Sequence, residues 1–305
     1  MTEPLAGESN SGALAASVSR ELTGLLSRAL LPGLYLLATP IGNLGDISLR
    51  ALAIMAQADR LYCEDTRHSR RLLDRFGITR KLRSYHDHNE SEQLHEVLGE
   101  LAQGRALGLM SDAGTPLISD PGFKLVRAAL EAGHKVFAVP GASAVLAALS
   151  ASGLASDCFT FVGFLPAKAG QRLDRLREFT NVTGTLIFFE SPGRVEATLA
   201  ALREVFGGHS PAAIARELTK LHEEMRRGSL DDLLAWARSQ EIRGEVVILV
   251  APMRSADTEA SDEEIDTALS QHSGGSLRDR VDAVATLLRA PRKKVYDLAL
   301  RLRKD

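Results

Sequence analysis

At 305 residues the chain is long enough to bury a sizeable core, and its length favours two domains. Its 37 basic and 39 acidic side chains give a formal net charge of -2, which argues against a broadly cationic coat for nucleic acid. The two cysteines, Cys63 and Cys158, lack the spacing of metal ligands and are typical of a reducing compartment, so we expect a cytoplasmic protein.

The N-terminal segment carries acidic side chains and scattered Ser, Gly and Ala, without a basic stretch leading into an unbroken apolar run. This composition argues against a signal peptide and predicts a flexible extension over residues 1–33. The best membrane candidate, residues 136–155, carries no charge but is interrupted by Pro140-Gly141. We interpret it as a buried strand, turn and helix, so no membrane segment is expected.

From residue 34 onward, short apolar runs alternate with helical periodicity, which predicts a parallel sheet covered on both faces. The predicted strands are residues 34–38, 60–64, 106–112 and 135–139, and the predicted helices are residues 48–57, 69–76, 91–103 and 123–132. In such sheets ligands bind beyond the carboxyl ends of the strands, where the loops gather. The loops that matter most there are TPIGNLGD (39–46), EDTRHS (64–69) and SDAGTPLISDPG (111–122).

A second α/β unit of similar size follows Pro140-Gly141, and its strand spacing allows a mixed sheet. Its predicted strands are residues 159–164, 185–190, 212–218 and 245–250, and its predicted helices are residues 171–179, 194–205 and 230–239. After Pro252 a polar, acidic linker precedes two predicted helices, residues 276–289 and 291–303. We therefore expect two α/β domains, over residues 34–140 and 141–252, and a small helix-turn-helix-like domain with its linker over residues 253–305.

The loop SDAGTPLISDPG is the most informative segment of the chain. Gly114 and Gly122 permit a close approach or a positive φ, and Pro116 and Pro121 stiffen the loop, so it can hold a ligand at a small ordering cost. An ordinary turn-rich connection has the same composition. From spacing alone the two interpretations are evenly balanced, since loops at this edge of a sheet are commonly functional.

Other motifs give weaker signals. TPIGNLGD lacks the G-x-G-x-x-G fingerprint, and His86 and His88 lack a further metal-ligand motif, so we expect a polar loop and no metal site there. Basic residues gather after EDTRHS and again in the C-terminal segment, where they form either a solvated helix face or a phosphate-binding patch. ESPGR (190–194) and RELTK (216–220) place further charges at the strand ends of the second unit, where salt bridges are the plain alternative.

Seven segments occur in a fixed order: LYLLATPIGNLGDISLRA, EDTRHSRRLL, SDAGTPLISDPG, VPGASA, FVGFLP, ESPGR and ARELTK. Together they resemble the tetrapyrrole-methylase superfamily, and within it the bacterial branch that methylates the ribose 2′-oxygen of cytidine 1402 in 16S ribosomal RNA. The resemblance extends over residues 34–250, and the helical tail is similar to the small C-terminal domain of that branch. The first loop lacks the glycine-rich pattern of the porphyrin methylases and the 111–122 loop is longer than theirs, which favours the ribosomal RNA branch.

This resemblance implies two α/β domains that enclose S-adenosylmethionine in a cleft, and usually a homodimer. Carried over position by position, it assigns donor contacts to loops and strand ends of both domains. The residues are Pro40, Ile41, Asp112, Gly114, Thr115, Leu117, Ile118, Ser143, Ala144, Phe189, Ala215 and Glu245.

The expected reaction is therefore methylation of 16S ribosomal RNA, with the small ribosomal subunit as partner. A ribose hydroxyl needs a group that takes its proton, and our candidates are Asp65, Glu190 and Lys220. The expected RNA contacts are Arg67, Arg70, Arg71, Arg194, Arg292, Lys293 and Lys294. Two alternatives remain: a C-methyltransferase acting on an anionic tetrapyrrole, and a non-catalytic RNA-binding factor of ribosome assembly.

Overall fold

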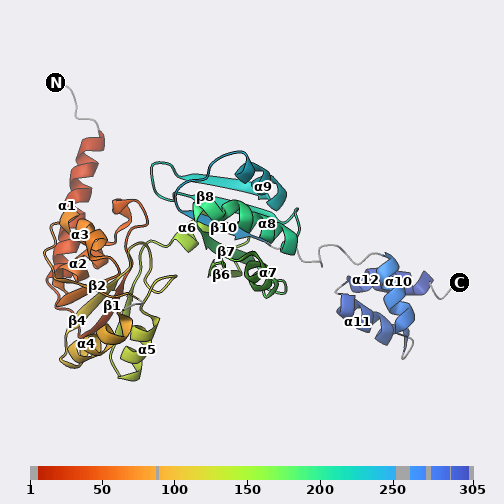
Figure 1. Ribbon diagram of the computed structural model, residues 1–305, viewed down its shortest axis with the longest axis horizontal. Coiled ribbons are helices and arrows are strands. Elements are labelled where there is room, and N and C mark those ends of the chain that lie inside the picture. Colours follow the sequence, from red (N-terminus) through yellow and green to blue (C-terminus); the bar gives the residue numbers. More distant parts are fainter. Residues whose placement is uncertain (1–5, 87–88, 252–261, 273–275, 289, 302–305) are drawn as a thin grey trace.

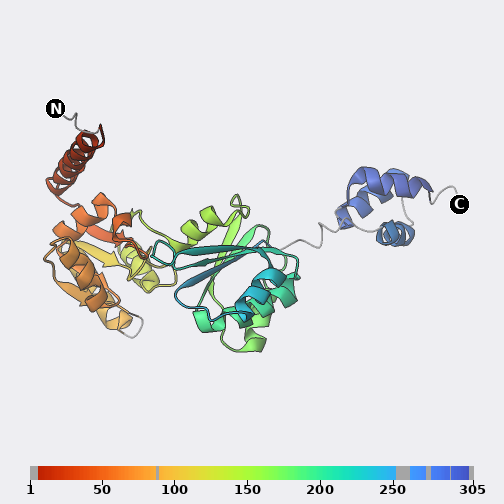
Figure 2. The ribbon, with the colours of Figure 1, turned by 90° about the horizontal axis from the view of Figure 1, so that it is seen from above.

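The computed structural model describes residues 6–86, 89–251, 262–272, 276–288 and 290–301. Two five-stranded sheets, each with its own helices, follow one another along the chain, and a group of helices comes last (Figures 1 and 2). This arrangement confirms the predicted fold class of two α/β units followed by a helical region.

The first sheet is parallel throughout and has the strand order β3-β2-β4-β1-β5. Its strands are β1 (Gly33–Leu37), β2 (Arg60–Cys63), β3 (Leu82–Ser84), β4 (Ala106–Met110) and β5 (Val136–Val139). Every residue of β4 is buried, as expected for a central strand covered on both faces. The sequence does not predict β3, because this edge strand has only three residues and one of them is an exposed arginine.

Helices cover both faces of this sheet. They are α2 (Leu49–Gln57), α3 (Thr66–Arg75), α4 (Glu90–Ala102) and α5 (Phe123–Glu131), with a short 3-10 turn at Leu44–Asp46. Successive strand residues point to opposite faces, so Leu61 packs with α2 and α3 whereas Tyr62 packs with α4 and α5. The loops that follow β1, β2 and β4 lie at the carboxyl edge of the sheet, beyond the layers of covering helices.

The N-terminal extension differs from its prediction. Helix α1 (Ala6–Leu26) occupies most of the segment predicted as flexible, and its last turn packs on the first unit. Leu22 lies against the apolar cluster under α2, and the side-chain amide of Gln57 donates from Nε2 to the carbonyl of Leu25 at 3.2 Å. The scattered Ser and Gly residues do not predict a helix in the sequence, and among the side chains of α1 that the structure describes, Leu22 near its C-terminal end packs against the apolar cluster.

The second sheet is mixed, as the sequence allows, with the strand order β6-β7-β10-β8-β9. Its strands are β6 (Phe159–Phe164), β7 (Thr185–Glu190), β8 (Pro211–Arg216), β9 (Glu224–Ser229) and β10 (Val246–Val250). Only β6 and β7 pair in parallel; β10 runs antiparallel to both of its neighbours. The sequence misses β9, whose residues EMRRGS lack apolar alternation because the strand lies at the sheet edge.

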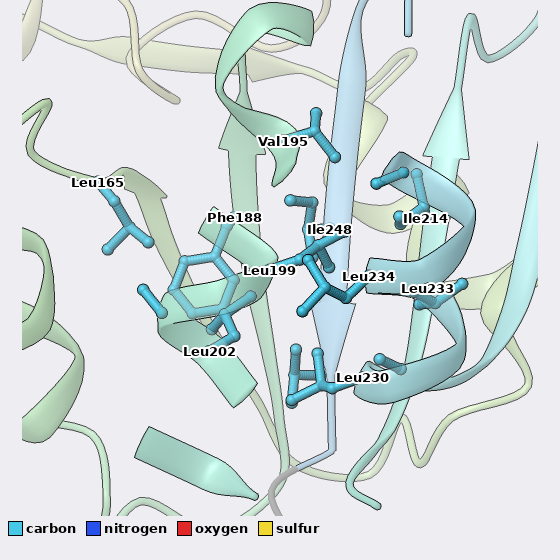
Figure 3. Close-up of a cluster of buried hydrophobic side chains, with 14 of the residues drawn as sticks. Leu165, Phe188, Val195, Leu199, Leu202, Ile214, Leu230, Leu233, Leu234 and Ile248 are labelled. Atoms are coloured by element: carbon cyan, nitrogen blue, oxygen red, sulfur yellow. The ribbon is translucent and has the colours of Figure 1, made fainter. Parts of the chain in front are cut away.

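The core of the second unit lies between its sheet and helices α8 and α9 (Figure 3). Phe188, Ile214 and Ile248 from three adjacent strands meet Leu199 and Leu234 from the two helices. The helices of this unit are α6 (Ala144–Ser152), α7 (Ala169–Arg177), α8 (Val195–Phe206) and α9 (Leu230–Arg238), with a 3-10 turn at Pro192–Arg194. Helix α6 packs on the opposite face, where Val145 and Leu149 contact β8 and β10 residues.

Three helices form the C-terminal group, α10 (Asp262–Gln271), α11 (Leu277–Leu288) and α12 (Arg292–Arg301). They pack around their own apolar cluster, to which Ile265, Val281 and Val295 contribute. The sequence predicts only the last two helices, because the acidic residues at the start of α10 resemble the polar linker that precedes them. Residues 252–261 of that linker lie outside the described residues. Among the helices that the structure describes, none is long and apolar enough to cross a bilayer.

Candidate functional site

A cavity of about 440 Å³ lies between the loops of the first sheet and one face of the second sheet. Both α/β units contribute to its walls. The lining residues are Ile41, Ala113, Gly114, Thr115, Ile118, Ser119, Asp120, Ser143, Ala144, Val145, Phe164, Phe189, Glu190, Ser191, Pro192, Ala215, Leu218, Gly244, Glu245, Val246 and Val247.

Two loops of the first unit are tied together beside this cavity. The backbones of Thr39 and Gly114 exchange two hydrogen bonds, of 2.9 and 3.0 Å, and the Thr39 hydroxyl donates to the carbonyl of Ser111 at 2.9 Å. Gly114 has φ 80°, a conformation that its missing Cβ makes accessible. Leu117 and Ser119 have φ 72° and 65° without being glycines, so the following turn is held in a disfavoured conformation by its surroundings.

The loop between β8 and β9 closes the cavity from the second unit. The Asn43 backbone amide donates to the Thr219 hydroxyl at 3.0 Å, which joins the first loop of one unit to this loop of the other. The Lys220 ammonium lies 2.8 Å from Glu217 and 3.1 Å from Glu245. Glu217 and Thr219 both have positive φ, so this loop is also held in a disfavoured conformation.

The charged residues that line the cavity are all acids: Asp120, Glu190 and Glu245. Among the described residues, no Lys, Arg or His lines it. Apolar walls face these acids, and the rings of Phe161 and Phe164 lie edge-on to Phe189, with centroids 4.9 and 5.7 Å away. Such a cavity favours a ligand with a positive charge and a flat apolar part, and it disfavours a phosphate.

Glu190 has the most fully bonded carboxylate of the three acids. One oxygen accepts from the Ser191 backbone amide at 2.8 Å, and the other accepts from the buried Thr198 hydroxyl at 2.6 Å. The Arg194 guanidinium lies 3.3 Å from the first oxygen. Buried charges persist where they are paired and hydrogen-bonded in this way, so this carboxylate is a structural anchor at the edge of the cavity.

The other two candidate proton acceptors lie outside the cavity lining. Asp65 caps α3, and hydrogen bonds from the Arg67 side chain and backbone lower its pKa to about 2. Burial would lower the pKa of Lys220, but hydrogen bonds to Glu217 and Glu245 outweigh burial and raise it. Asp65 is therefore a weak base, and Lys220 stays charged.

Nine of the twelve predicted donor-binding residues line the cavity, and the structure brings them together from six separate segments. They are Ile41, Gly114, Thr115, Ile118, Ser143, Ala144, Phe189, Ala215 and Glu245. Pro40, Asp112 and Leu117 lie beside it. The Asp112 carboxylate accepts from the Asp65 amide at 3.1 Å, and Leu117 packs in the core under α4 and α5.

Two of the predicted RNA-binding arginines have structural partners instead. Arg194 donates to the carbonyls of Leu165 and Pro166, at 2.6 and 3.2 Å, besides its ion pair with Glu190. Arg70 donates to the carbonyl of Arg80 at 2.9 Å. The carbonyl partners of these arginines are 10 or more residues away in the sequence, so the charge pattern alone does not predict these hydrogen bonds.

The remaining predicted RNA contacts lie nearer the solvent. The Arg67 side chain is 88% exposed, although it pairs with Asp65, and Arg71 is exposed on the same helix. In α12, Arg292 pairs with Asp282, Lys294 lies 3.5 Å from Asp262, and Lys293 is exposed. His88 lies outside the described residues, within which no group of three acidic, His or Cys side chains is placed to hold a metal.

Asp120, Ser119 and Phe164 line the cavity without having been predicted as site residues. All three belong to motifs that the sequence singles out, SDAGTPLISDPG and FVGFLP. The signal that identifies Asp120 is its position at the end of a rigid loop, in the same segment as the predicted donor contacts. No spacing rule separates it from an ordinary turn aspartate.

Comparison with known proteins finds sequences similar to this chain among methyltransferases. Residues 33–234 match the family of Tetrapyrrole (Corrin/Porphyrin) Methylases. The protein of Mesorhizobium japonicum called Ribosomal RNA small subunit methyltransferase I is 52% identical over 241 residues, covering 79% of this chain and 82% of its own. The protein of the same name from Xylella fastidiosa is 46% identical over 270 residues, covering 87% and 98%.

Solved structures share the fold at low sequence identity. Uroporphyrin-III C-methyltransferase from Thermus thermophilus in complex with S-adenosylhomocysteine aligns with a TM-score of 0.50 at 20% identity, covering 71% of this chain and 96% of its own. Diphthine synthase aligns with a TM-score of 0.57 at 15% identity, covering 72% and 89%. At these identities the likeness establishes the fold alone.

Proposed function

The chain belongs to the tetrapyrrole methylase family, and on that premise we propose that it methylates the ribosomal RNA of the small subunit with S-adenosylmethionine as donor. The acceptor is the ribose 2′-oxygen of cytidine 1402 in 16S ribosomal RNA. The observation that carries this proposal is the acid-lined cavity between the two α/β units, built from nine of the residues that the sequence assigns to the donor.

The donor fits the chemistry of this cavity. A volume of about 440 Å³ lies within the range of small-molecule sites, roughly 300–1,000 Å³. S-adenosylmethionine supplies, when bound, an electrophilic methyl group on a positively charged sulfur, and its adenine is flat and largely apolar. The acids Asp120 and Glu245 complement the positive charge, while Ile118, Phe164 and Phe189 offer apolar walls for the base.

The backbone at the start of α6 serves the other end of the donor. Ser143 caps this helix, with its hydroxyl accepting from the Leu146 amide at 3.4 Å, and Ala144 begins it. The free amides of a helix N-terminus favour a carboxylate such as that of the methionine part. Asp112 and Leu117 support this site through their own contacts in the 111–122 loop, and the ring of Pro40 restricts the backbone of the first loop beside Ile41.

Glu190, Lys220 and Asp65 position the site in this proposal. Glu190 holds the start of α8 through Ser191 and Thr198, and Lys220 fixes Glu245 at the rim. Asp65 caps α3 and orients Arg67 toward solvent, where this arginine is available for an RNA phosphate. Arg71 and Lys293 extend the basic surface, whereas Arg70, Arg194, Arg292 and Lys294 act mainly through their protein partners.

Relatives favour ribosomal RNA over a tetrapyrrole as the acceptor. The relatives with 41–52% identity that cover most of this chain bear the ribosomal RNA name, whereas the tetrapyrrole enzymes share the fold at about 20% identity. An assembly factor without catalysis would not need the acid-lined cavity. The proposed enzyme acts in the cytoplasm as a homodimer, on the small subunit or its RNA.

The test is a methyl-transfer assay with donor labelled in the methyl group. Small subunits lacking the modification, free 16S ribosomal RNA and uroporphyrinogen are the three acceptors, and the labelled RNA is mapped for ribose methylation. The proposal predicts label on one ribose of the 16S RNA. Label on the tetrapyrrole would favour the C-methyltransferase. Absence of donor binding, together with absence of label on all three acceptors, would favour the non-catalytic RNA-binding factor.

A further inference from the structure

The start of α7 lies at the rim of the cavity, beyond the carboxyl end of β6. Phe164, the last residue of β6, lines the cavity and is 57% exposed. Strands β6 and β7 run in parallel, so the loops that follow them lie at the same edge of the sheet, and Ser191 and Pro192 after β7 line the cavity as well. Residues 165–168, which join β6 to α7, therefore continue directly from the cavity wall.

Two arginines hold the segment that leads into α7. Arg194 donates to the carbonyls of Leu165 and Pro166, at 2.6 and 3.2 Å. Arg172 donates from Nη1 to the carbonyl of Ala167 at 3.4 Å. Three successive carbonyls thus accept from guanidinium groups, which fixes the backbone just before the helix and places its first turn beside the cavity.

Arg172 has fewer partners than a buried charge needs. Its side chain is only 7% exposed, its Nε atom is buried without a partner, and it has no ion pair within the described residues. A guanidinium carries five N–H donors and stays charged, so burial with one long hydrogen bond is unfavourable unless an anion pairs with it. Helical side chains lean toward the N-terminus, and the bond to Ala167 places this guanidinium at the first turn of α7.

The backbone of the same turn offers free donors. Helix α7 is nine residues long, and the amides of Ala169, Gly170 and Gln171 at its start have no hydrogen-bond partner in the part of the chain that the structure describes. The Lys168 side chain does not cap them, and a Cβ on Gly170 would meet nothing within 4 Å, so the turn is open. Free amides and the helix dipole favour an anion here, and the exposed Lys168 adds a positive charge.

The acids of α7 do not occupy this position. The first turn of the helix contains no Asp or Glu. Farther along, Asp174 pairs with Arg177 at 2.9 Å, and Glu178 pairs with Arg175. An anion that complements the first turn therefore has to come from another molecule.

We propose that the start of α7 binds a backbone phosphate of the acceptor RNA, an inference that rests on the proposed function. The phosphate oxygens accept from the free amides of residues 169–171 and pair with Arg172 and Lys168. The charged residues that line the cavity are acids, which repel a phosphate. The strand is therefore held with its phosphate at the rim and its ribose directed into the cavity.

The experiment compares Ala169→Pro and Arg172→Met with Arg177→Met, a control that removes an exposed arginine from the other end of α7. Proline fits the first helical position but lacks the amide proton, and Lys168 before it already has the extended backbone that proline favours, with φ -72° and ψ 130°. The affinity for unmodified 16S RNA is measured at several salt concentrations, with and without inorganic phosphate as competitor. The kcat and KM on small subunits, the donor Kd by calorimetry and the thermal midpoint complete the comparison.

We expect Ala169→Pro to weaken RNA binding about tenfold and to raise the KM by a similar factor, while kcat, the donor Kd and the thermal midpoint stay close to wild type. Arg172→Met should lower the slope of log affinity against log salt by about 0.7, the share of one phosphate contact on a single strand. Its thermal midpoint should not fall, because methionine replaces an underbonded buried charge. Arg177→Met should match wild type, and inorganic phosphate should compete with RNA on wild type but not on Arg172→Met.

The proposal is overturned if Ala169→Pro and Arg172→Met both keep the RNA affinity and the KM within about twofold of wild type, or if Arg177→Met weakens RNA binding as much as they do. Arg172-dependent binding of inorganic phosphate without any effect of the variants on RNA would assign the turn to a free anion and also overturn it. Failure of the wild-type protein to bind the donor or to methylate would overturn the proposed function instead.

Discussion

A Cβ atom on Gly42 would lie 2.5 Å from the Cγ atom of Lys220, so the two α/β units leave no room for a side chain at this contact. The same atom would lie 3.0 Å from the carbonyl oxygen of Leu218. Gly42 follows Ile41, and Leu218 is two residues before Lys220. Ile41 and Leu218 both line the cavity. The width of this cavity is therefore set where these two loops touch.

Replacing Gly42 by Ala should push the two loops apart. We expect the donor Kd to rise about tenfold, since loss of fit at a packed contact costs about 1–3 kcal/mol. Gly99→Ala is the control, because a Cβ at this helical position meets nothing within 4 Å and alanine favours the helix. Calorimetry measures the donor Kd of both variants; an unchanged Kd for Gly42→Ala would show that the contact does not set the site.

Thr198→Val keeps the shape of a fully buried side chain but removes its hydroxyl. The Glu190 oxygen that accepts at 2.6 Å then loses its partner inside the protein. An unpaired buried acceptor costs about 1–3 kcal/mol, so the free energy of unfolding in urea should fall by that amount. Thr180→Val, at an exposed threonine of the same unit, should keep the free energy of unfolding within about 0.5 kcal/mol of wild type. Equal losses of stability in the two variants would show that the hydrogen bond from Thr198 to Glu190 does not stabilise the fold.

Leu199→Ala should test the core of the second unit shown in Figure 3. This fully buried leucine packs between strands and α9, so its truncation should lower the free energy of unfolding by about 2–5 kcal/mol. The control is the same truncation at Leu221, which is 92% exposed in the β8–β9 loop. Leu221→Ala should change stability by less than about 0.5 kcal/mol, and a comparable loss there would contradict the packing.

Arg194→Ala should act on stability first, because its guanidinium holds two backbone carbonyls and Glu190. We expect a lower thermal midpoint. Arg67→Ala should leave the midpoint unchanged and reduce the salt dependence of RNA binding, since its side chain is 88% exposed and suited to a phosphate. Thermal melts and binding at several salt concentrations separate the two roles; the reverse pattern would restore Arg194 as the RNA contact.

The pH dependence of Asp65 follows from its contacts with Arg67. Its pKa is about 2 in the folded protein against an ordinary value of 3.8, so its contribution to stability is fully present above about pH 4 and is lost as the pH falls through about 2. NMR titration of the Arg67→Ala protein should show the Asp65 pKa rising toward its ordinary value. Arg71→Ala, on the same helix, should leave it low; a low value in both variants would exclude the Arg67 side chain as the cause.

The sequence predicts most of the fold because the buried elements have clear apolar periods. It predicts eight strands and misses β3 and β9, two edge strands whose residues include Arg83, Arg226 and Arg227. Arg226 stacks over the Trp236 ring at 5.2 Å, a partner that only the folded chain supplies. The sequence does not predict helices α1 and α10, because their many polar residues are typical of a flexible extension and of a linker.

The candidate site is predicted in part for a related physical reason. Glycine and apolar positions such as Gly114 and Ala215 line one cavity, because the resemblance places them on loops and strands that the fold then brings together. The identity of the proton acceptor stays a prediction, because the pKa of a carboxyl depends on the partners that the fold brings to it. Glu190 has Arg194 and Thr198, whereas Asp120 has a hydroxyl and a second acid.

Calorimetric titration with S-adenosylmethionine tests most directly whether the cavity between the two units holds the methyl donor. Ala144 lines this cavity at the start of α6, so Ala144→Leu should fill it, whereas Ala151→Leu adds the same volume to an exposed position of that helix. We predict one donor molecule per chain for the wild type and Ala151→Leu, and a Kd at least about tenfold weaker for Ala144→Leu. Unchanged binding by a folded Ala144→Leu protein, or no binding by the wild type, would contradict the assignment.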